Sequence, residues 1–209
     1  METVVVHSSE AGAVKRAAAV LREGGLVVFP TDTVYGLAAL FDDPAAVTRL
    51  YRVKGRASDR PIALLLDHVD RLPLVAVLPD VALPLARHFW PGGLTMVLPK
   101  TGRVSEEVSA GPTVGVRVPG LPLTRRLIRA AGGVLAVTSA NRSGQPPACT
   151  AEEALEQMGG EFEMLVDGGR CCGLPSTVLD CTVWPPVVMR SGAVEEEAIF
   201  ALLRRAGVL

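Results

Sequence analysis

The chain has 209 residues, of which 49% are hydrophobic and 21% charged, a composition that excludes an intrinsically disordered protein. A formal net charge of −1 excludes a uniformly basic nucleic-acid-binding domain, so any attraction for phosphate must be local. The sequence shows no secretory leader and no apolar run near the roughly 20 residues of a membrane helix. We therefore expect a cytoplasmic protein without membrane contact.

Helical and strand patterns alternate along the chain, which predicts one α/β domain over residues 1–209 and no second domain. The predicted helices cover residues 10–23, 44–53, 83–90, 123–131, a segment from 151 onward, and 195–205. The predicted strands cover residues 26–30, 61–66, 94–99, 113–119, 134–139, 164–167, 177–180 and 186–190. Because short strands follow one another closely, we expect a mixed parallel and antiparallel sheet.

Three of the predicted helices begin with a recognisable signal. Ser8 or Ser9 is the expected cap of the first helix. Asp43, followed directly by proline, marks the start of the second. Thr150 and Glu153 have the spacing of a capping box.

Common catalytic motifs are absent from the sequence. It contains no G-x-x-x-x-G-K-[ST], G-x-G-x-x-G or G-x-S-x-G segment, and its three histidines lack metal-ligand spacing. Cys149, Cys171, Cys172 and Cys181 form no zinc pattern, so reduced thiols are expected. The adjacent Cys171 and Cys172 are either a redox pair or incidental thiols in a loop, and the second interpretation is favoured.

A polar loop follows the first predicted strand. Thr31, Asp32 and Thr33 come directly after it, at the end of the strand where α/β proteins bind ligands. Thr33 offers a hydroxyl, and Gly36 allows close approach of the backbone. The alternative is an ordinary turn in which Asp32 caps the following segment.

The stretch YRVKGRASDRP, residues 51–61, concentrates positive charge in a nearly neutral chain. In an extended backbone, the side chains of Lys54 and Arg56 would lie on the same side of the chain, with Gly55 between them, and face a solvent-filled pocket. A neighbouring ammonium and guanidinium suit a polyphosphate, and Arg60 adds a third cation. The alternative is a solvated charged loop.

The segment TVGVRVP alternates, with Thr113, Gly115 and Arg117 on its polar side. An arginine in that place needs an anion or water as its partner, and a structural ion pair is the alternative. In the loop TSANRSGQPP, Ser139 and Asn141 share a side, although a satisfied turn would explain them too.

Ser176 precedes the strand TVLD, and Arg190 ends the strand VVMR. Each signal is weak alone. Several strand-end segments that all offer hydroxyls, amides or cations together predict an anion-binding pocket.

The segments FPTDTVYGL, YRVKGR, PGGLTMVL, VGVRVP, TSANRSG and STVLD occur in the order and spacing of the YrdC/TsaC (Sua-type) family. The chain resembles that family from about residue 13 to 192, and a Lys-x-Arg paired with a distant Ser-x-Asn is the specific part of the resemblance. The resemblance implies a twisted mixed sheet flanked by helices, with a concave cationic cavity. It also implies a nucleotidyltransferase that makes threonylcarbamoyl-AMP and pyrophosphate from L-threonine, bicarbonate or CO2, and ATP.

The same resemblance implies the partners. ATP would be a substrate that arrives with Mg²⁺, whose protein ligands the sequence does not identify, and no tightly bound cofactor or covalent nucleophile is expected. A threonylcarbamoyltransferase complex would then pass the group to tRNAs that read ANN codons, and tRNA itself is a further candidate partner.

Carried over by position, the family's nucleotide-binding residues are Lys54, Arg56, Arg60, Thr113, Ser139, Asn141, Cys149 and Arg190. Its threonine-binding residues are Thr33, Arg117 and Ser176. Lys54 and Arg56 are also the predicted catalytic residues, through their charge at the transferred phosphate. The chain departs from the family pattern at Arg60, where many relatives have Asn or Lys, at Cys149, where Thr or Ser is usual, and at Leu65, where some have His.

Three other functions compete with the synthase. A pocketed RNA-binding or translation-factor-like module could use the same cations, but it would need stacking aromatics, and aromatic residues make up only 4% of the chain. Hydrogenase-maturation carbamoyltransferases contain a related domain beside acylphosphatase and zinc-finger segments that this sequence lacks. A regulatory paralogue without threonine binding is the third.

Overall fold

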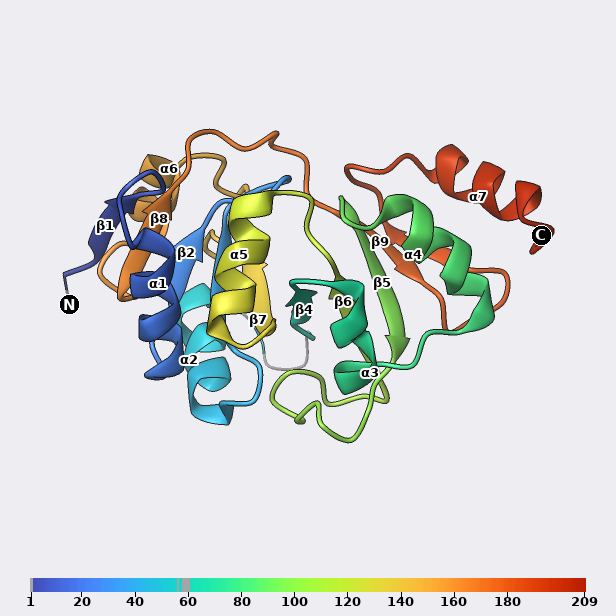
Figure 1. The fold of residues 1–209 in the computed structure, drawn as a ribbon, viewed down its shortest axis with the longest axis horizontal. Coiled ribbons are helices and arrows are strands. Elements are labelled where there is room, and N and C mark those ends of the chain that lie inside the picture. The colour runs from blue at the N-terminus through green and yellow to red at the C-terminus, as the bar shows by residue number, and fades with distance from the viewer. Residues whose placement is uncertain (1, 56, 58–60) are drawn as a thin grey trace.

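The computed structural model describes residues 2–55, 57 and 61–209 (Figure 1). Its strands are β1 (Val4–His7), β2 (Val27–Phe29), β3 (Gly36–Leu40), β4 (Ala63–Leu66), β5 (Leu94–Pro99), β6 (Thr113–Arg117), β7 (Val134–Ser139), β8 (Met164–Asp167), β9 (Thr177–Asp180) and β10 (Val187–Arg190). Its α-helices are α1 (Ala13–Arg22), α2 (Pro44–Lys54), α3 (Leu72–Val75), α4 (Leu83–Phe89), α5 (Pro122–Ala131), α6 (Ala151–Met158) and α7 (Glu196–Arg205). None of the helices in the described ranges is long and apolar enough to cross a membrane.

The ten strands of the described residues form one sheet in the order β1-β8-β2-β3-β7-β4-β6-β5-β9-β10. β8 is parallel to β1 and β2, and the pairs β4–β6 and β5–β9 are also parallel. The other neighbouring strands are antiparallel. The predicted mixed sheet is therefore confirmed.

Alternation along the strands divides the hydrophobic core between the two faces of the sheet. Leu64 and Leu66 of β4 belong to a cluster that also contains residues of α2, α4 and α7. Leu65, between them, belongs to a second cluster with residues of α1 and α5. These two helices lie side by side across the sheet in Figure 1. The face on which Leu65 lies also carries the candidate site.

Two of the three predicted caps are confirmed. Asp43 Oδ1 accepts the backbone N–H groups of Ala45 and Ala46 at the start of α2. Thr150 Oγ1 accepts the N–H of Glu153, whose carboxylate accepts an N–H one residue before the cap. The cap predicted for α1 is wrong, because that helix begins only at Ala13, after a glycine with φ of 80°.

Two strands were not predicted. β3 reads GLAAL, which has no β-branched residue, and it becomes a strand because β2 and β7 pair with it on both sides. β1 is an edge strand that pairs only with β8 among the described strands. Pairing partners thus decide β3, whereas β1, with three consecutive valines, also has a high local β-propensity.

Candidate functional site

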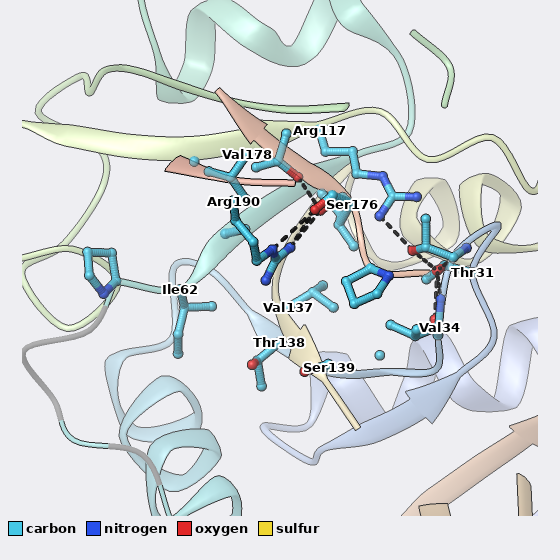
Figure 2. A pocket seen from close by; sticks show the side chains of 18 of the residues that line it. Thr31, Val34, Ile62, Arg117, Val137, Thr138, Ser139, Ser176, Val178 and Arg190 are labelled. Atoms are coloured by element: carbon cyan, nitrogen blue, oxygen red, sulfur yellow. Dashed lines mark hydrogen bonds between the residues drawn. The ribbon is translucent and has the colours of Figure 1, made fainter. Parts of the chain in front are cut away.

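A cavity of about 390 Å³ opens on the face of the sheet that carries α1 and α5 (Figure 2). That volume lies within the range of about 300–1,000 Å³ that is typical of small-molecule sites. Leu65 and Val137 line the cavity and also belong to the hydrophobic cluster beneath those helices. Six predicted site residues line it, namely Thr33, Thr113, Arg117, Ser139, Ser176 and Arg190.

Arg117 is held in the cavity wall by three side-chain hydrogen bonds. Its Nε donates to the Gly92 carbonyl oxygen at 2.8 Å, and its two terminal nitrogens donate to Thr33 Oγ1 at 2.9 Å and Asp32 Oδ1 at 2.7 Å. The predicted polar side of β6 is therefore correct. The structural ion pair considered as an alternative is also present, with Asp32, while the arginine still lines the cavity.

The charge of Arg117 is buried, since only 6% of its side chain is exposed. Burial lowers the pKa of this guanidinium from its ordinary value, and the carboxylate of Asp32 acts in the opposite direction. Arginine nevertheless stays protonated in proteins. The cavity wall therefore carries a buried cation.

Ser176 connects two parts of the cavity wall. Its hydroxyl is 2.8 Å from Thr95 Oγ1, and Arg190 donates both to its carbonyl oxygen at 2.7 Å and to its hydroxyl at 3.1 Å. β10 pairs with β9, which places Arg190 over this residue. A residue predicted to bind threonine and a residue predicted to bind the nucleotide thus contact each other, as Figure 2 shows.

Lys54 meets the Ser-x-Asn segment, as the resemblance led us to expect. Its ammonium donates to the carbonyl oxygen and hydroxyl of Ser139, at 2.6 Å and 3.1 Å, and to Asn141 Oδ1. The Asn141 amide in turn donates to the carbonyl oxygens of Arg142 and Gln145, which fixes the loop. Residues that are 85 positions apart in the sequence are therefore joined at one end of the cavity.

The predicted exposure of Lys54 is wrong. Lys54 is the last residue of α2 and is 3% exposed, and Gly55 after it ends the helix in the left-handed region, with φ of 63°. The backbone is therefore not extended at Lys54, whose side chain is buried beneath the loop. Arg56 and Arg60, the other two predicted cations, lie outside the described residues.

Cys149 is not part of the cavity lining, although Pro147, two residues earlier, is. The carbonyl oxygen of Cys149 accepts the N–H of Cys171 at 2.8 Å, so two of the cysteine-containing segments are neighbours. Burial raises the pKa of the Cys171 thiol to about 11, which disfavours a thiolate there at neutral pH. Cys172 is exposed, and its Sγ lies 3.4 Å from the Thr33 carbonyl oxygen.

Sequence reasoning placed Thr31 in the candidate loop without giving it a ligand role, and it did not assign Thr95 to the cavity. Thr31 and Thr95 both line it and are 5% and 4% exposed. Thr31 Oγ1 is 2.9 Å from the hydroxyl of Thr33, and Thr95 contacts Ser176. A signal existed for Thr95, because alternation in LTMVLP places it on the face opposite Leu94 and Met96.

The family model Sua5/YciO/YrdC, described as "Telomere recombination", matches residues 19–192. A threonylcarbamoyl-AMP synthase of Pyrococcus abyssi is 41% identical over 189 residues, which are 89% of this chain but 56% of that protein. The chain thus spans about half the length of that relative. A putative threonylcarbamoyl-AMP synthase of Mycobacterium tuberculosis is 38% identical over 192 residues, or 90% of this chain and 87% of that protein.

A solved structure gives the same result in three dimensions. The crystal structure of P. abyssi Sua5 complexed with L-threonine superposes with a TM-score of 0.92 at 39% identity. The match covers 97% of this chain and 61% of that one. The chain belongs to the Sua5/YciO/YrdC family.

Proposed function

We propose that this protein is an L-threonylcarbamoyladenylate synthase, a nucleotidyltransferase that converts L-threonine, bicarbonate or CO2, and ATP into threonylcarbamoyl-AMP and pyrophosphate. Arg117 is the observation that carries the proposal. A buried guanidinium lines a cavity of small-molecule size, in a chain that superposes on a relative's complex with L-threonine. The tRNA-modifying complex that would consume the product is part of the same proposal.

The threonine subsite would lie at Arg117. A guanidinium has five N–H donors, and three are engaged in the hydrogen bonds described above. One N–H on each terminal nitrogen is left for the two oxygens of a carboxylate. Thr33 and Ser176 would bind the other polar groups of the amino acid, and Leu65 gives this part of the cavity an apolar wall.

The nucleotide subsite would lie between Ser139, Thr113 and Arg190, with Mg²⁺ arriving as part of the ATP substrate. Lys54 and Asn141 hold the Ser139 loop from beneath. The contacts of the Lys54 ammonium with this loop favour an indirect role, in which it fixes the loop and adds positive charge below the phosphates. Arg56, Arg60 and Cys149 stay candidate ATP ligands from the family resemblance alone.

The proposed reaction requires the protein to position the reactants and to stabilise negative charge on the phosphates. The threonine amine attacks the carbon of CO2, a C–N bond forms, and loss of a proton leaves a carbamate. A carbamate oxygen then attacks the α-phosphorus of ATP while the bond to pyrophosphate breaks. No covalent intermediate with the protein is required, since holding the reactants together and stabilising the phosphate charge lowers the barrier.

The two tyrosines give the RNA-binding alternative no support. Both tyrosines are buried, with Tyr35 at 0% and Tyr51 at 7% exposed. The Tyr35 hydroxyl donates to the Gly169 carbonyl oxygen inside the protein. Neither ring can therefore serve as a platform on which a nucleic-acid base stacks.

Omitting substrates one at a time tests the proposal. We expect pyrophosphate release from ATP to need both L-threonine and bicarbonate, because the carbamate made from them is the proposed nucleophile. The measurement is an enzyme-coupled pyrophosphate assay with each component left out in turn. Equal release without threonine would refute the synthase, and a fluorescence titration with tRNA would then test the RNA-binding alternative.

A further inference from the structure

Asp32 contacts Arg117 without being part of the cavity wall. Its neighbours Thr31 and Thr33 both line the cavity, whereas Asp32 does not. Its Oδ1 accepts from a terminal nitrogen of Arg117 at 2.7 Å, and 23% of its side chain is exposed. The carboxylate thus approaches the guanidinium from outside the space that a substrate would fill.

The contacts of Arg117 determine how its guanidinium is oriented. Each of its three nitrogens donates to a different acceptor, on Gly92, Thr33 and Asp32. Rotation of the planar group would break at least one of these hydrogen bonds. Asp32 is the charged member of the three, and it offsets part of the cost of burying a cation.

Gly120 leaves room for the carboxylate on its other side. A Cβ atom at residue 120 would lie 2.9 Å from Asp32 Oδ2, closer than such atoms approach in proteins. Asp32 therefore packs between a glycine backbone and Arg117. That packing restricts where the carboxylate can move.

From these contacts we propose that Asp32 is a positioning residue, which holds the Arg117 guanidinium toward the cavity so that its two remaining N–H donors meet the carboxylate of threonine. This inference rests on the proposed function for the identity of the ligand. Asp32 would act through Arg117, since it is not among the residues that line the cavity.

Two substitutions separate positioning from other roles. Asp32→Asn keeps an oxygen acceptor for Arg117, so its KM for threonine should stay within about threefold of wild type. Asp32→Ala removes the acceptor, and its KM for threonine should rise roughly ten- to a hundred-fold, with kcat at saturating threonine nearly unchanged. Asp42→Ala, at an exposed aspartate ten positions later, is the matched control.

The outcomes are distinct. Equal and severe loss of kcat in both Asp32 variants would overturn positioning and indicate a direct chemical role. A lower Tm with unchanged KM for threonine would show a purely structural ion pair. A crystal structure of Asp32→Ala gives a test that does not depend on activity: the proposal expects a reoriented Arg117, and an unchanged guanidinium would refute it even if wild type proved not to use threonine.

Discussion

Replacing Arg117 should produce the largest loss of threonine binding of any single substitution in the cavity. Arg117→Ala is expected to nearly abolish threonine-dependent turnover. Arg117→Lys keeps the charge but not the paired donors, and should raise KM for threonine roughly ten- to a hundred-fold, the cost of about 1.5–3 kcal/mol for a lost charge-assisted hydrogen bond. Isothermal titration with threonine and, separately, with ATP measures the two affinities.

Arg126→Lys is the matched control, since Arg126 is an exposed arginine on α5. The control should bind both ligands as wild type does. A collapse of ATP affinity in Arg117→Lys with threonine affinity intact would reverse the proposed division of the cavity. Comparing Tm values of the variants shows how much of any loss comes from unpairing Asp32.

Lys54→Ala should impair both stability and catalysis. A lysine that faced a solvent-filled pocket, as the sequence predicted, could be replaced with the fold intact, but the structure places Lys54 in a buried network with Ser139 and Asn141. Leaving those acceptors without their donor should cost about 1–3 kcal/mol of unfolding free energy. For a chain of this length that corresponds to about 2–4 °C in Tm per kcal/mol.

In the same variant, kcat/KM for ATP should fall by roughly ten- to a hundred-fold, because the Ser139 loop loses its anchor and the positive charge beneath it. The assay is run well below the Tm of the variant, so that unfolded protein does not contribute. Arg52→Ala removes an exposed cation from the same helix and serves as the control. Near-normal activity in Lys54→Ala would exclude any role of this network in nucleotide binding.

Most of the strands that line the cavity could be predicted, because their patterns of apolar residues are long enough to identify a strand. In TVGVRVP the two-residue period assigned Arg117 to the correct side of β6, and the structure confirms that side chain in the cavity lining. Family spacing connected Lys54 with Ser139 and Asn141, a contact that local patterns cannot reveal across 85 residues.

Other features could not be predicted, because they depend on tertiary pairing or because a local sequence signal was given another interpretation. β3 is a strand because it lies between β2 and β7, which its alanine-rich sequence does not indicate. Asp32 was considered as a turn cap, and its partner Arg117 lies 85 positions away on a strand whose position in the sheet was not predicted. A glycine directly after a helix whose last turn contains basic residues is a signal for the end of a helix. Treating Gly55 as this signal would have placed Lys54 at the end of α2.

The proposed function requires that this chain itself makes a threonylcarbamoyl adenylate. The most direct measurement is mass spectrometry of the product formed from ATP, L-threonine and ¹³C-labelled bicarbonate. We expect an adenylate that contains threonine and one ¹³C atom and that is absent when any substrate is omitted. Consumption of ATP without any threonine-containing adenylate, under conditions where the product is stable, would contradict it.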